Sequence, residues 1–522
     1  MALFKQVALL LPLLGAAAAV NLTCPDYYVY STEQHPPYSG GVYNLSWQRP
    51  EPRCRTFNLS IVEDAVDRVA DDISDPDLKR LFVNSYPNSL DTAVKWKGYA
   101  NNGSDEELTF LITGDINAMW LRDSANQVQS YLPLLEASDS AHSLASLYRG
   151  VINLQARYIL TDPYCNAFQP PVESGVPPSE NGAASADTVV PVYNNQSVFE
   201  CKYELDSLAA FLEVSRNYYN VTQDIDFFKK YNWVSAISSI MEVAQAQMIP
   251  TYQSNGNVSV LDYTFTRETT RASETTENDG LGNPINSGTG LIRSFFRPSD
   301  DSTIFQFLVP SNMMFASYLE PCAEIMALVG GQDQLAQKMR ELSKSLRQSI
   351  KTHAVSTSKK YGSFYPYEVD GYMGQNIMDD ANIPSLLAAP FYGYLDVNDE
   401  TYQNTRALIL SADNPYFMRG PVISAIGGPH NGPGYAWPMA SIVRILTSSD
   451  DGEITQQLQE IVSSTDGYGL IHESINTFNT SDWTRQWFSW ANGLFGQMIL
   501  DLDDRKPEIL KQSFQGNGSY TM

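Results

Sequence analysis

Apolar residues recur at helical spacing along most of the chain. Leu144, Leu147, Tyr148, Val151 and Leu154, for example, follow the pattern of a helix with one buried face. Together with flanking polar residues, such patterns predict helices over 58–72, 122–136, 141–160, 204–220, 225–249, 311–329, 333–353, 383–391, 400–411, 435–448, 453–464 and 486–501. Strand-like runs are short and scattered, as at 261–266 and 303–309. The chain is therefore expected to be mainly helical.

The predicted helices come in pairs, and this favours one architecture. About twelve helices in six successive pairs favour an all-α fold, an (α/α)6 barrel or six-hairpin toroid, with long loops gathered at the active-site mouth. An elongated array of helical repeats is the alternative, but the sequence has no fixed period. Strands do not alternate with helices, which disfavours a doubly wound sheet or a β/α barrel. The segment 165–200 is too long for a plain connector, so we expect it to be functional or partly mobile.

The N-terminus indicates export. A weakly basic start, Met1–Lys5, precedes an apolar run from Val7 to Leu14 and then small residues, Ala16–Ala19. This pattern is typical of a signal peptide, with a buried N-terminal helix as the alternative. We find no later segment apolar and long enough to span a bilayer, so we expect a secreted or secretory-pathway protein without membrane attachment. The expected divisions are a signal peptide at 1–19, an irregular arm at 20–56, the main domain at 57–502 and a C-terminal tail at 503–522.

N-glycosylation sequons agree with this compartment. A single sequon is close to chance, but many behind a signal peptide are typical of a eukaryotic secretory glycoprotein. The sequons are centred on Asn21, Asn44, Asn58, Asn102, Asn195, Asn220, Asn257, Asn479 and Asn517.

The five cysteines permit at most two disulfide bonds and one free thiol. Cys322 lies in a helix-like apolar stretch, so we expect it to be the buried free thiol. Cys24–Cys54 and Cys165–Cys201 are then the economical pairings, although the sequence does not prove the connectivity.

The formal net charge of −25 disfavours nucleic acid and anionic membranes as partners. The five histidines show no zinc-binding spacing, and the acidic pairs Asp300-Asp301 and Asp379-Asp380 lack the ladder of a calcium loop. Nucleophile-elbow, phosphate-loop and dinucleotide-binding motifs are also missing from the sequence. We therefore expect neither a metal nor a cofactor, and the candidate chemistry belongs to carboxylates.

One short segment combines groups suited to sugar binding. Asp115, Trp120, Arg122 and Asp123 lie within nine residues, where an irregular segment enters a predicted helix. An indole stacks on the C–H face of a sugar, and Asp with Arg can bind adjacent hydroxyl groups. The alternative is a buried ion pair beside a packed tryptophan.

Asp206 and Glu473 stand out as candidate acid and base. Asp206 lies in the first turn of a predicted helix, and Glu473 lies in a loop ahead of Trp483, Arg485 and several further aromatic residues. Glycoside hydrolysis needs one carboxylic acid and one carboxylate, and aromatic walls raise the pKa of the acid. The alternatives are a helix N-cap for Asp206 and an ion pair with Arg485 for Glu473.

The run from Gly114 to Ser124 resembles the signature of glycoside hydrolase family 125, the exo-acting α-1,6-mannosidases of bacteria and fungi. Further family-like blocks follow in the same order at 203–208, 294–301, 309–313, 379–386, 437–439, 472–474 and 487–492. The resemblance covers 57–502, leaving out the arm and the tail.

The resemblance implies an (α/α)6 barrel and hydrolysis with inversion, without a catalytic metal. Asp206 matches the family's general acid, Glu473 its general base, and Arg122 and Asp123 the positions that hold the terminal mannose. Other residues placed in the substrate-binding site are Asp115, Trp120, Arg297, Asp301, Asn312, Trp437 and His472. Ile475 departs from the family pattern, in which an aromatic residue is expected.

The sequence therefore predicts an inverting exo-α-1,6-mannosidase that acts as a monomer on α-mannoside glycans, whether N-glycans, O-glycans or mannan. Two alternatives remain: another inverting α-glycosidase on the same type of fold, and a mannoside-binding protein without catalysis. The presence of both candidate carboxylates disfavours the second alternative.

Overall fold

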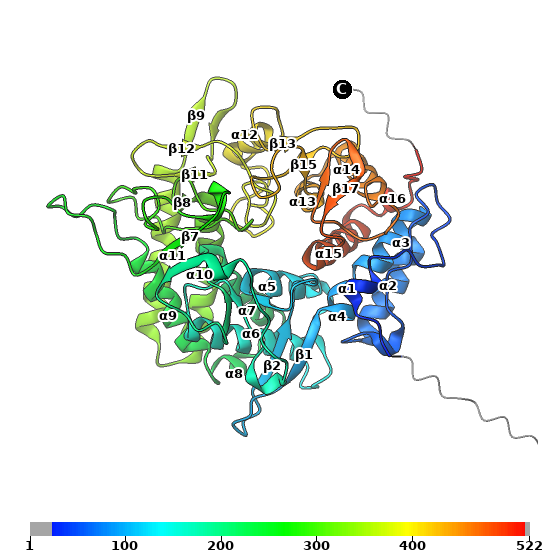
Figure 1. Cartoon of the computed structure of the whole chain (residues 1–522), viewed down its shortest axis with the longest axis horizontal. Helices are drawn as coiled ribbons and strands as arrows, with labels where there is room; N and C mark the ends of the chain where they lie inside the picture. The colour runs from blue at the N-terminus through cyan, green and yellow to red at the C-terminus, as the bar shows by residue number, and fades with distance from the viewer. Residues whose placement is uncertain (1–22, 517–522) are drawn as a thin grey trace, which may run out of the picture.

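A computed structural model describes residues 23–516, and these residues are rich in helix (Figure 1). The helices are α1 Tyr27–Tyr30, α2 Ser60–Asp72, α3 Pro76–Ser85, α4 Asn88–Thr92, α5 Leu121–Gln129, α6 Leu144–Thr161, α7 Leu205–Thr222, α8 Ile225–Phe228, α9 Trp233–Ala246, α10 Val309–Val329, α11 Asp333–His353, α12 Glu400–Ile409, α13 Pro438–Leu446, α14 Asp451–Ser463, α15 Ser489–Arg505 and α16 Pro507–Leu510. Most of the predicted helices are confirmed, with shifted ends.

The helices follow one another around a ring in chain order (Figure 1). Helix α7 packs between α5 and α10, and α10 packs on its hairpin partner α11. On the other side of the ring, α15 contacts α13 as well as α3 and α5. The last long helix therefore meets the first ones, which brings the two ends of the domain together.

The helices form where the sequence has one continuous apolar face. In α2, the side chains of Val62, Ala65, Val66 and Val69 are buried at i, i+3, i+4 and i+7, while most of the intervening positions are more exposed. This is the arrangement that lets a helix cover a core on one side and face water on the other.

One predicted helix, 383–391, is wrong: the structure forms turns there. Pro390 has no N–H for a helical bond to residue 386. The Asp379 carboxylate accepts the N–H groups of Leu386 and Leu387, at 2.8 and 2.9 Å, so a side chain takes the place of helical carbonyls. At this point an irregular segment takes the place of a helix in the ring.

The expected all-α fold needs correction as well, because small antiparallel sheets lie between the helices. The pairings are β1 Val94–Tyr99 with β2 Glu107–Leu111; β3 Met119–Trp120 with β4 Ala167–Phe168 and β6 Val198–Glu200; β5 Asp187–Val190 with β7 Thr264–Arg267; β8 Phe307–Leu308 with β11 Glu368–Val369 and β12 Gln375–Asn376; β9 Ser356–Ser358 with β10 Gly362–Phe364; β13 Phe417–Met418 with β14 Ala425–Ile426; and β15 Tyr435–Ala436 with β16 Ser474–Asn476 and β17 Asn479–Thr484. Several strands are too short for a periodic sequence signal.

Both expected disulfides are confirmed. Cys24–Cys54 closes the arm, and Cys165–Cys201 joins the segments around β4 and β6. Cys322 is a buried free thiol whose S–H donates to the Leu212 carbonyl at 3.3 Å. Two disulfides fit an extracytoplasmic protein.

The described residues also bear on export and glycosylation. None of the helices within 23–516 is apolar and long enough to cross a membrane. The predicted signal peptide and the sequons at Asn21 and Asn517 lie outside the described residues. Of the other sequons, Asn58 is half-buried and the remainder are exposed: Asn44, Asn102, Asn195, Asn220, Asn257 and Asn479.

Candidate active site

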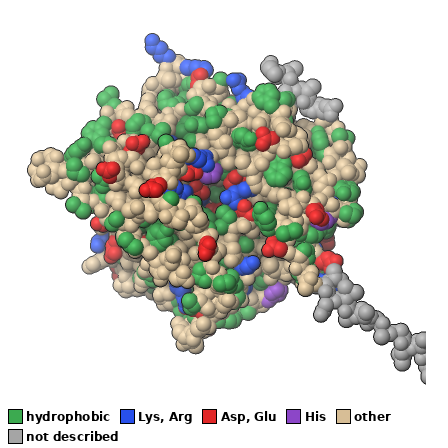
Figure 2. Space-filling view, in the orientation of Figure 1, with side chains coloured by type: hydrophobic (Ala, Val, Ile, Leu, Met, Phe, Trp, Pro, Cys, Tyr) green, Lys and Arg blue, Asp and Glu red, His purple; other side chains and the backbone are tan. Residues whose placement is uncertain are grey.

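A polar and aromatic pocket is formed where loops from different parts of the ring meet. Figure 2 shows charged side chains and a histidine around a hollow near the centre of the visible face. The pocket holds about 430 Å³ of empty space, counting its open mouth. Its walls are formed by Thr113, Ile116, Trp120, Arg122, Asp123, Pro298, Ser299, Asp300, Asn382, His430, Trp437, Glu473, Arg485, Phe488 and Trp490.

The segment that resembles the family signature forms one wall. Trp120 ends β3, which pairs with β4, and the next residue begins α5. Arg122 and Asp123 therefore lie in the first turn of a helix that points at the pocket. Gly114 has φ +129°, and a Cβ there would lie 3.0 Å from the Trp487 indole nitrogen. Glycine is thus required for this loop to approach the aromatic wall.

Arg122 is buried and binds several carboxylates. Its Nη1 donates to Glu204 and to Asp206, the latter at 3.0 Å, and its Nη2 lies 3.6 Å from Asp123. Burial raises the pKa of Asp123 to about 6, against the opposing effect of Arg122. A carboxyl group with this pKa, in a pocket wall, can exchange hydrogen bonds with sugar hydroxyls as an acceptor or as a donor.

Asp206 lies outside the pocket. Its side chain is fully buried at the start of α7, where Oδ1 accepts from Ser311 at 3.1 Å and Oδ2 accepts from Arg122. Burial raises the pKa of this carboxyl. Asp206 supports the guanidinium of Arg122 from behind, and this position does not suit a proton donor to a sugar in the pocket.

Glu473 lines the pocket and is held in a fixed orientation. Thr484 Oγ1 donates to Glu473 Oε2 at 2.9 Å, and Arg485 Nε donates to Oε1 at 2.9 Å. Arg485 also pairs with Asp115, which lies in the groove outside the pocket. The ion pair between Glu473 and Arg485 therefore exists, and it lies within the pocket wall. Pairing with Arg485 does not exclude a role for Glu473 as a base, because the paired carboxylate still lines the pocket.

Asp300 is a pocket residue that is not among the predicted site residues. It adopts φ +69° in the turn before Asp301, and its side chain is about one-third exposed. Lys202 Nζ lies 3.9 Å from its Oδ1. Asp300 lines both the pocket and the adjoining groove, so its carboxylate lies at the boundary between them.

The remaining predicted residues divide into two groups. Trp437 is in the pocket wall, with Trp120. Arg297 is buried in an ion pair with Glu368 at 2.6 Å, and Asn312 is fully buried with its amide bonded to the backbone of Leu308 and of Ile292.

Asp301 and His472 also lie behind the pocket surface. Asp301 is buried and accepts from Ser299 Oγ at 3.3 Å. The His472 ring stacks on Trp483 with centroids 4.4 Å apart, and burial lowers its pKa to about 4. His472 is therefore a neutral, packed side chain at neutral pH.

One group of described residues has the geometry to approach a metal ion: Asp162, Cys165 and Cys201. Both of these cysteines form the Cys165–Cys201 disulfide, so their sulfur atoms are not free thiolates. This group lies away from the pocket lining described above.

Comparison with known proteins identifies the family. Residues 75–500 match the model of glycoside hydrolase family 125, described as metal-independent α-mannosidases. The meiotically up-regulated gene 157 protein of Schizosaccharomyces pombe is 43% identical over 513 residues, which covers 97% of this chain and 99% of that protein.

A solved structure is similar over the same region. It is a metal-independent α-mannosidase from Streptococcus pneumoniae, in a non-productive complex with α-1,6-mannobiose. The match has a TM-score of 0.75 and 33% sequence identity, and it covers 86% of this chain and 99% of that one.

Proposed function

Because the chain belongs to the metal-independent α-mannosidases of glycoside hydrolase family 125, we propose that it is an exo-α-1,6-mannosidase that hydrolyses with inversion. The observation that carries this proposal is the pocket itself. It combines tryptophan walls, the Arg122–Asp123 pair and two further carboxylates, Asp300 and Glu473, in a space suited to one terminal sugar. The α-1,6 linkage is supported by the mannobiose bound to the similar Streptococcus pneumoniae enzyme.

In this proposal the pocket binds the terminal mannose and the adjoining groove binds the sugar that leaves. Arg122 and Asp123 bind hydroxyl groups, while Trp120 and Trp437 contact the C–H faces of the ring. The groove begins beside Asp300 and includes Asp115 and Lys202.

Glu473 acts as general base and Asp300 as general acid. Glu473 takes a proton from a water molecule, whose oxygen forms a bond to the anomeric carbon. The bond from that carbon to the glycosidic oxygen breaks, and Asp300 gives its proton to this oxygen. We assign the acid role to Asp300 in place of Asp206, because Asp300 lies at the boundary that the glycosidic oxygen must occupy and Asp206 is enclosed behind Arg122.

We also infer the broader setting. The ring of helices is an (α/α)6 barrel in which the irregular segment 383–391 takes the place of one helix. The mature chain is exported, glycosylated and monomeric, and acts on terminal mannose of N-glycans, O-glycans or mannan. Export is supported by the disulfides and by exposed sequons.

A time course of α-1,6-mannobiose hydrolysis, followed by proton NMR, tests the activity and the mechanism. We expect β-mannose as the first-formed anomer, because inversion at an α-linked carbon gives the β product. A first product of α-mannose contradicts inversion, and no mannose release contradicts the activity. With a long α-1,6-mannan, we expect release of single mannose units; internal cleavage contradicts the exo assignment.

A further inference from the structure

Lys202 is a buried lysine that lines the groove beside the pocket, and the reaction described above gives its charge no part. Its side chain is 5% exposed, and it follows Cys201 directly. Three local features fix this position: β4 pairs with β6, the Cys165–Cys201 disulfide joins the same two segments, and Lys202 N–H donates to Asn166 Oδ1 at 3.0 Å. The backbone of Lys202 is therefore rigidly placed.

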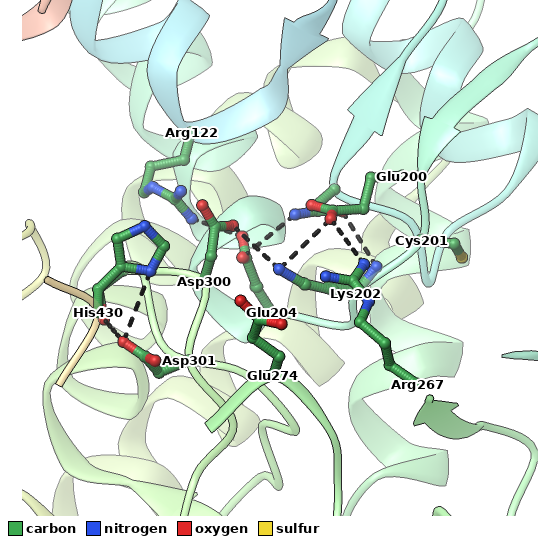
Figure 3. Close-up of polar contacts among 12 residues, drawn as sticks. Arg122, Glu200, Cys201, Lys202, Glu204, Arg267, Glu274, Asp300, Asp301 and His430 are labelled. Atoms are coloured by element: carbon green, nitrogen blue, oxygen red, sulfur yellow. Dashed lines mark hydrogen bonds and ion pairs between the residues drawn. The ribbon is translucent and has the colours of Figure 1, made fainter. Parts of the chain in front are cut away.

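The ammonium group of Lys202 lies between two carboxylates (Figure 3). Its Nζ is 3.3 Å from Glu200 Oε1 and 3.9 Å from Asp300 Oδ1, and it lies 5.4 Å from the centroid of the Phe296 ring. Arg267 shares Glu200, at 3.3 Å. A lysine is rarely buried without such partners, because an uncompensated charge in the interior is costly.

Other cations near Asp300 are occupied by other anions. Arg122 is paired with Glu204 and Asp206, and Arg485 is paired with Glu473 and Asp115. Lys202 differs from these two arginines in its partners. It shares the Glu200 carboxylate with Arg267, and its other carboxylate neighbour is Asp300.

We propose that Lys202 is a positioning residue: it holds the Asp300 carboxylate at the boundary of pocket and groove and sets the pH range in which Asp300 donates its proton. The inference rests on the proposed acid role of Asp300. It assigns no contact between Lys202 and the reacting atoms, since Lys202 acts through the carboxylate.

The charges around Asp300 give the direction of the effect. Burial raises the pKa of Asp300, but the surrounding cations, Lys202 the largest of them, lower it below its usual value, so Asp300 holds the proton that it donates only at acidic pH. The other charged and titratable groups around this carboxyl include Arg122, Asp123, Glu204, Asp301, His430 and Arg485. Glu473 lines the same pocket, and Glu200 and Glu274 line the same groove. Lys202 itself stays protonated: burial lowers its pKa, and Glu200 with Asp300 more than offsets this effect.

The test compares pH profiles of kcat/KM for the wild type, Lys202→Met and Lys202→Arg, with α-1,6-mannobiose as substrate. Removing a cation at this distance raises the pKa of a carboxyl by about 1–3 units, so in Lys202→Met the limb that reports Asp300 should move to higher pH by about that amount. The other limb should stay in place, and Lys202→Arg should restore the wild-type profile. A second substrate, 2,4-dinitrophenyl α-mannoside, identifies the limb, because its leaving group needs no proton.

Glu200→Gln provides a variant of opposite sign. It removes the negative charge of Glu200, which pairs with Lys202, so the limb of the pH profile that reports Asp300 should move to lower pH. This variant also decides the matter if Lys202→Met fails to fold, as judged by circular dichroism. Lys360→Met is the matched control: Lys360 pairs with Asp413 at an exposed site, and its profile should equal the wild type.

The outcomes separate the two proposals. If the wild type releases mannose but neither limb moves in Lys202→Met or Glu200→Gln, the role of Lys202 is refuted and the mannosidase stands. If Lys202→Met loses kcat/KM equally on both substrates while both limbs of the pH profile stay in place, Lys202 has a purely structural role, and the proposed positioning role is again refuted. A wild type that releases no mannose refutes the proposed function, and the role of Lys202 with it.

Discussion

Asp300 and Asp301 are adjacent in the chain but have different surroundings. Asp300 has φ +69° and lines the pocket, whereas Asp301 is buried and accepts from Ser299. Aspartate tolerates the left-handed region better than most residues, so this turn can present one carboxylate to the pocket while the next supports the loop.

The two candidate acids can be separated by isosteric substitution. Asp300→Asn should reduce kcat on α-1,6-mannobiose by about 10²–10⁴-fold, the usual contribution of a general acid, and reduce hydrolysis of 2,4-dinitrophenyl α-mannoside far less. Asp206→Asn should lower the melting temperature, because it weakens the buried contact with Arg122, and should retain more turnover per folded molecule. The reverse ranking of the two variants on mannobiose would restore the acid role to Asp206.

Asp123 offers a test of sugar binding that is independent of turnover. Asp123→Ala removes a pocket carboxylate, so affinity for free mannose should fall by about 10-fold or more, since a hydrogen bond to a charged group contributes about 1.5–3 kcal/mol. Titration calorimetry measures this affinity, under conditions where circular dichroism shows the variant folded. Unchanged affinity in the folded variant would mean that the 113–124 segment is only a scaffold.

The sequence predicts only part of the site, because it does not show which of the polar motif residues are buried away from the pocket. Trp120, Arg122, Asp123, Trp437 and Glu473 were predicted and do line one pocket. Arg297, Asp301, Asn312 and His472 belong to similar motifs, but their polar groups are used by buried protein partners or by stacking. A motif names the residues of a site without telling which of two neighbours faces the ligand, so the motif predicts Asp301 where the structure places Asp300 in the pocket.

At the scale of elements, α7 and α10 are joined by a buried polar contact as well as by apolar packing. Tyr318 Oη on α10 donates to Glu213 Oε1 on α7 at 2.8 Å, and Glu213 is 2% exposed. Burial raises the pKa of Glu213 from 4.5 to about 7.

The burial of Glu213 makes the stability of the fold depend on pH. Between pH 4.5 and about 7 the folded protein keeps a proton on Glu213 that the unfolded chain has lost. The contribution of Glu213 to the free energy of unfolding is therefore fully present below pH 4.5 and is lost as the pH rises through about 7. Its size is at most about 3 kcal/mol, at 1.36 kcal/mol per pKa unit.

Glu213→Gln should abolish this decline, because glutamine resembles the protonated acid. Denaturant unfolding between pH 4.5 and 7.5 measures it, with exposed Glu341→Gln on α11 as the control. A wild-type decline that persists in Glu213→Gln would assign it to another group.

Helices with a continuous apolar face, such as α2 and α6, were predictable because local spacing and burial agree. The segment 383–391 was not, because its backbone is organised by Pro390 and by the side chain of the nearby Asp379, a contact that the spacing of apolar residues does not reveal. Two-residue strands such as β3 and β4 were not predictable either, since their pairing depends on contacts remote in sequence.

At the scale of the whole molecule, the N-terminal arm supports the pocket from outside the family-matched region, 75–500. The rings of Tyr27 and Trp487 make a T-shaped contact with centroids 5.2 Å apart, and Trp487 is followed by the pocket residue Phe488. The Cys24–Cys54 disulfide closes the arm over a separation of 30 residues.

Opening that loop should weaken the fold. Replacing Cys24 and Cys54 by serine should lower the free energy of unfolding by about 3–4 kcal/mol, from the chain entropy of a loop of this length. Denaturant unfolding measures the change. Cys322→Ser is the matched control, because Cys322 closes no loop. Equal stability of the double variant and the wild type would mean that the arm is not coupled to the domain.

The ring joins its own beginning to its end, since α15 packs against α3 and α5, and the pocket takes walls from 113–123 and from 485–490. During synthesis, at about 5–20 residues per second, the first walls leave the ribosome well before the last ones. A nascent chain that stops before residue 485 lacks the pocket walls Arg485, Phe488 and Trp490, so we expect the pocket to be complete only once α15 has been made. We therefore expect a polypeptide truncated before residue 485 to release no mannose, because one side of its pocket is missing.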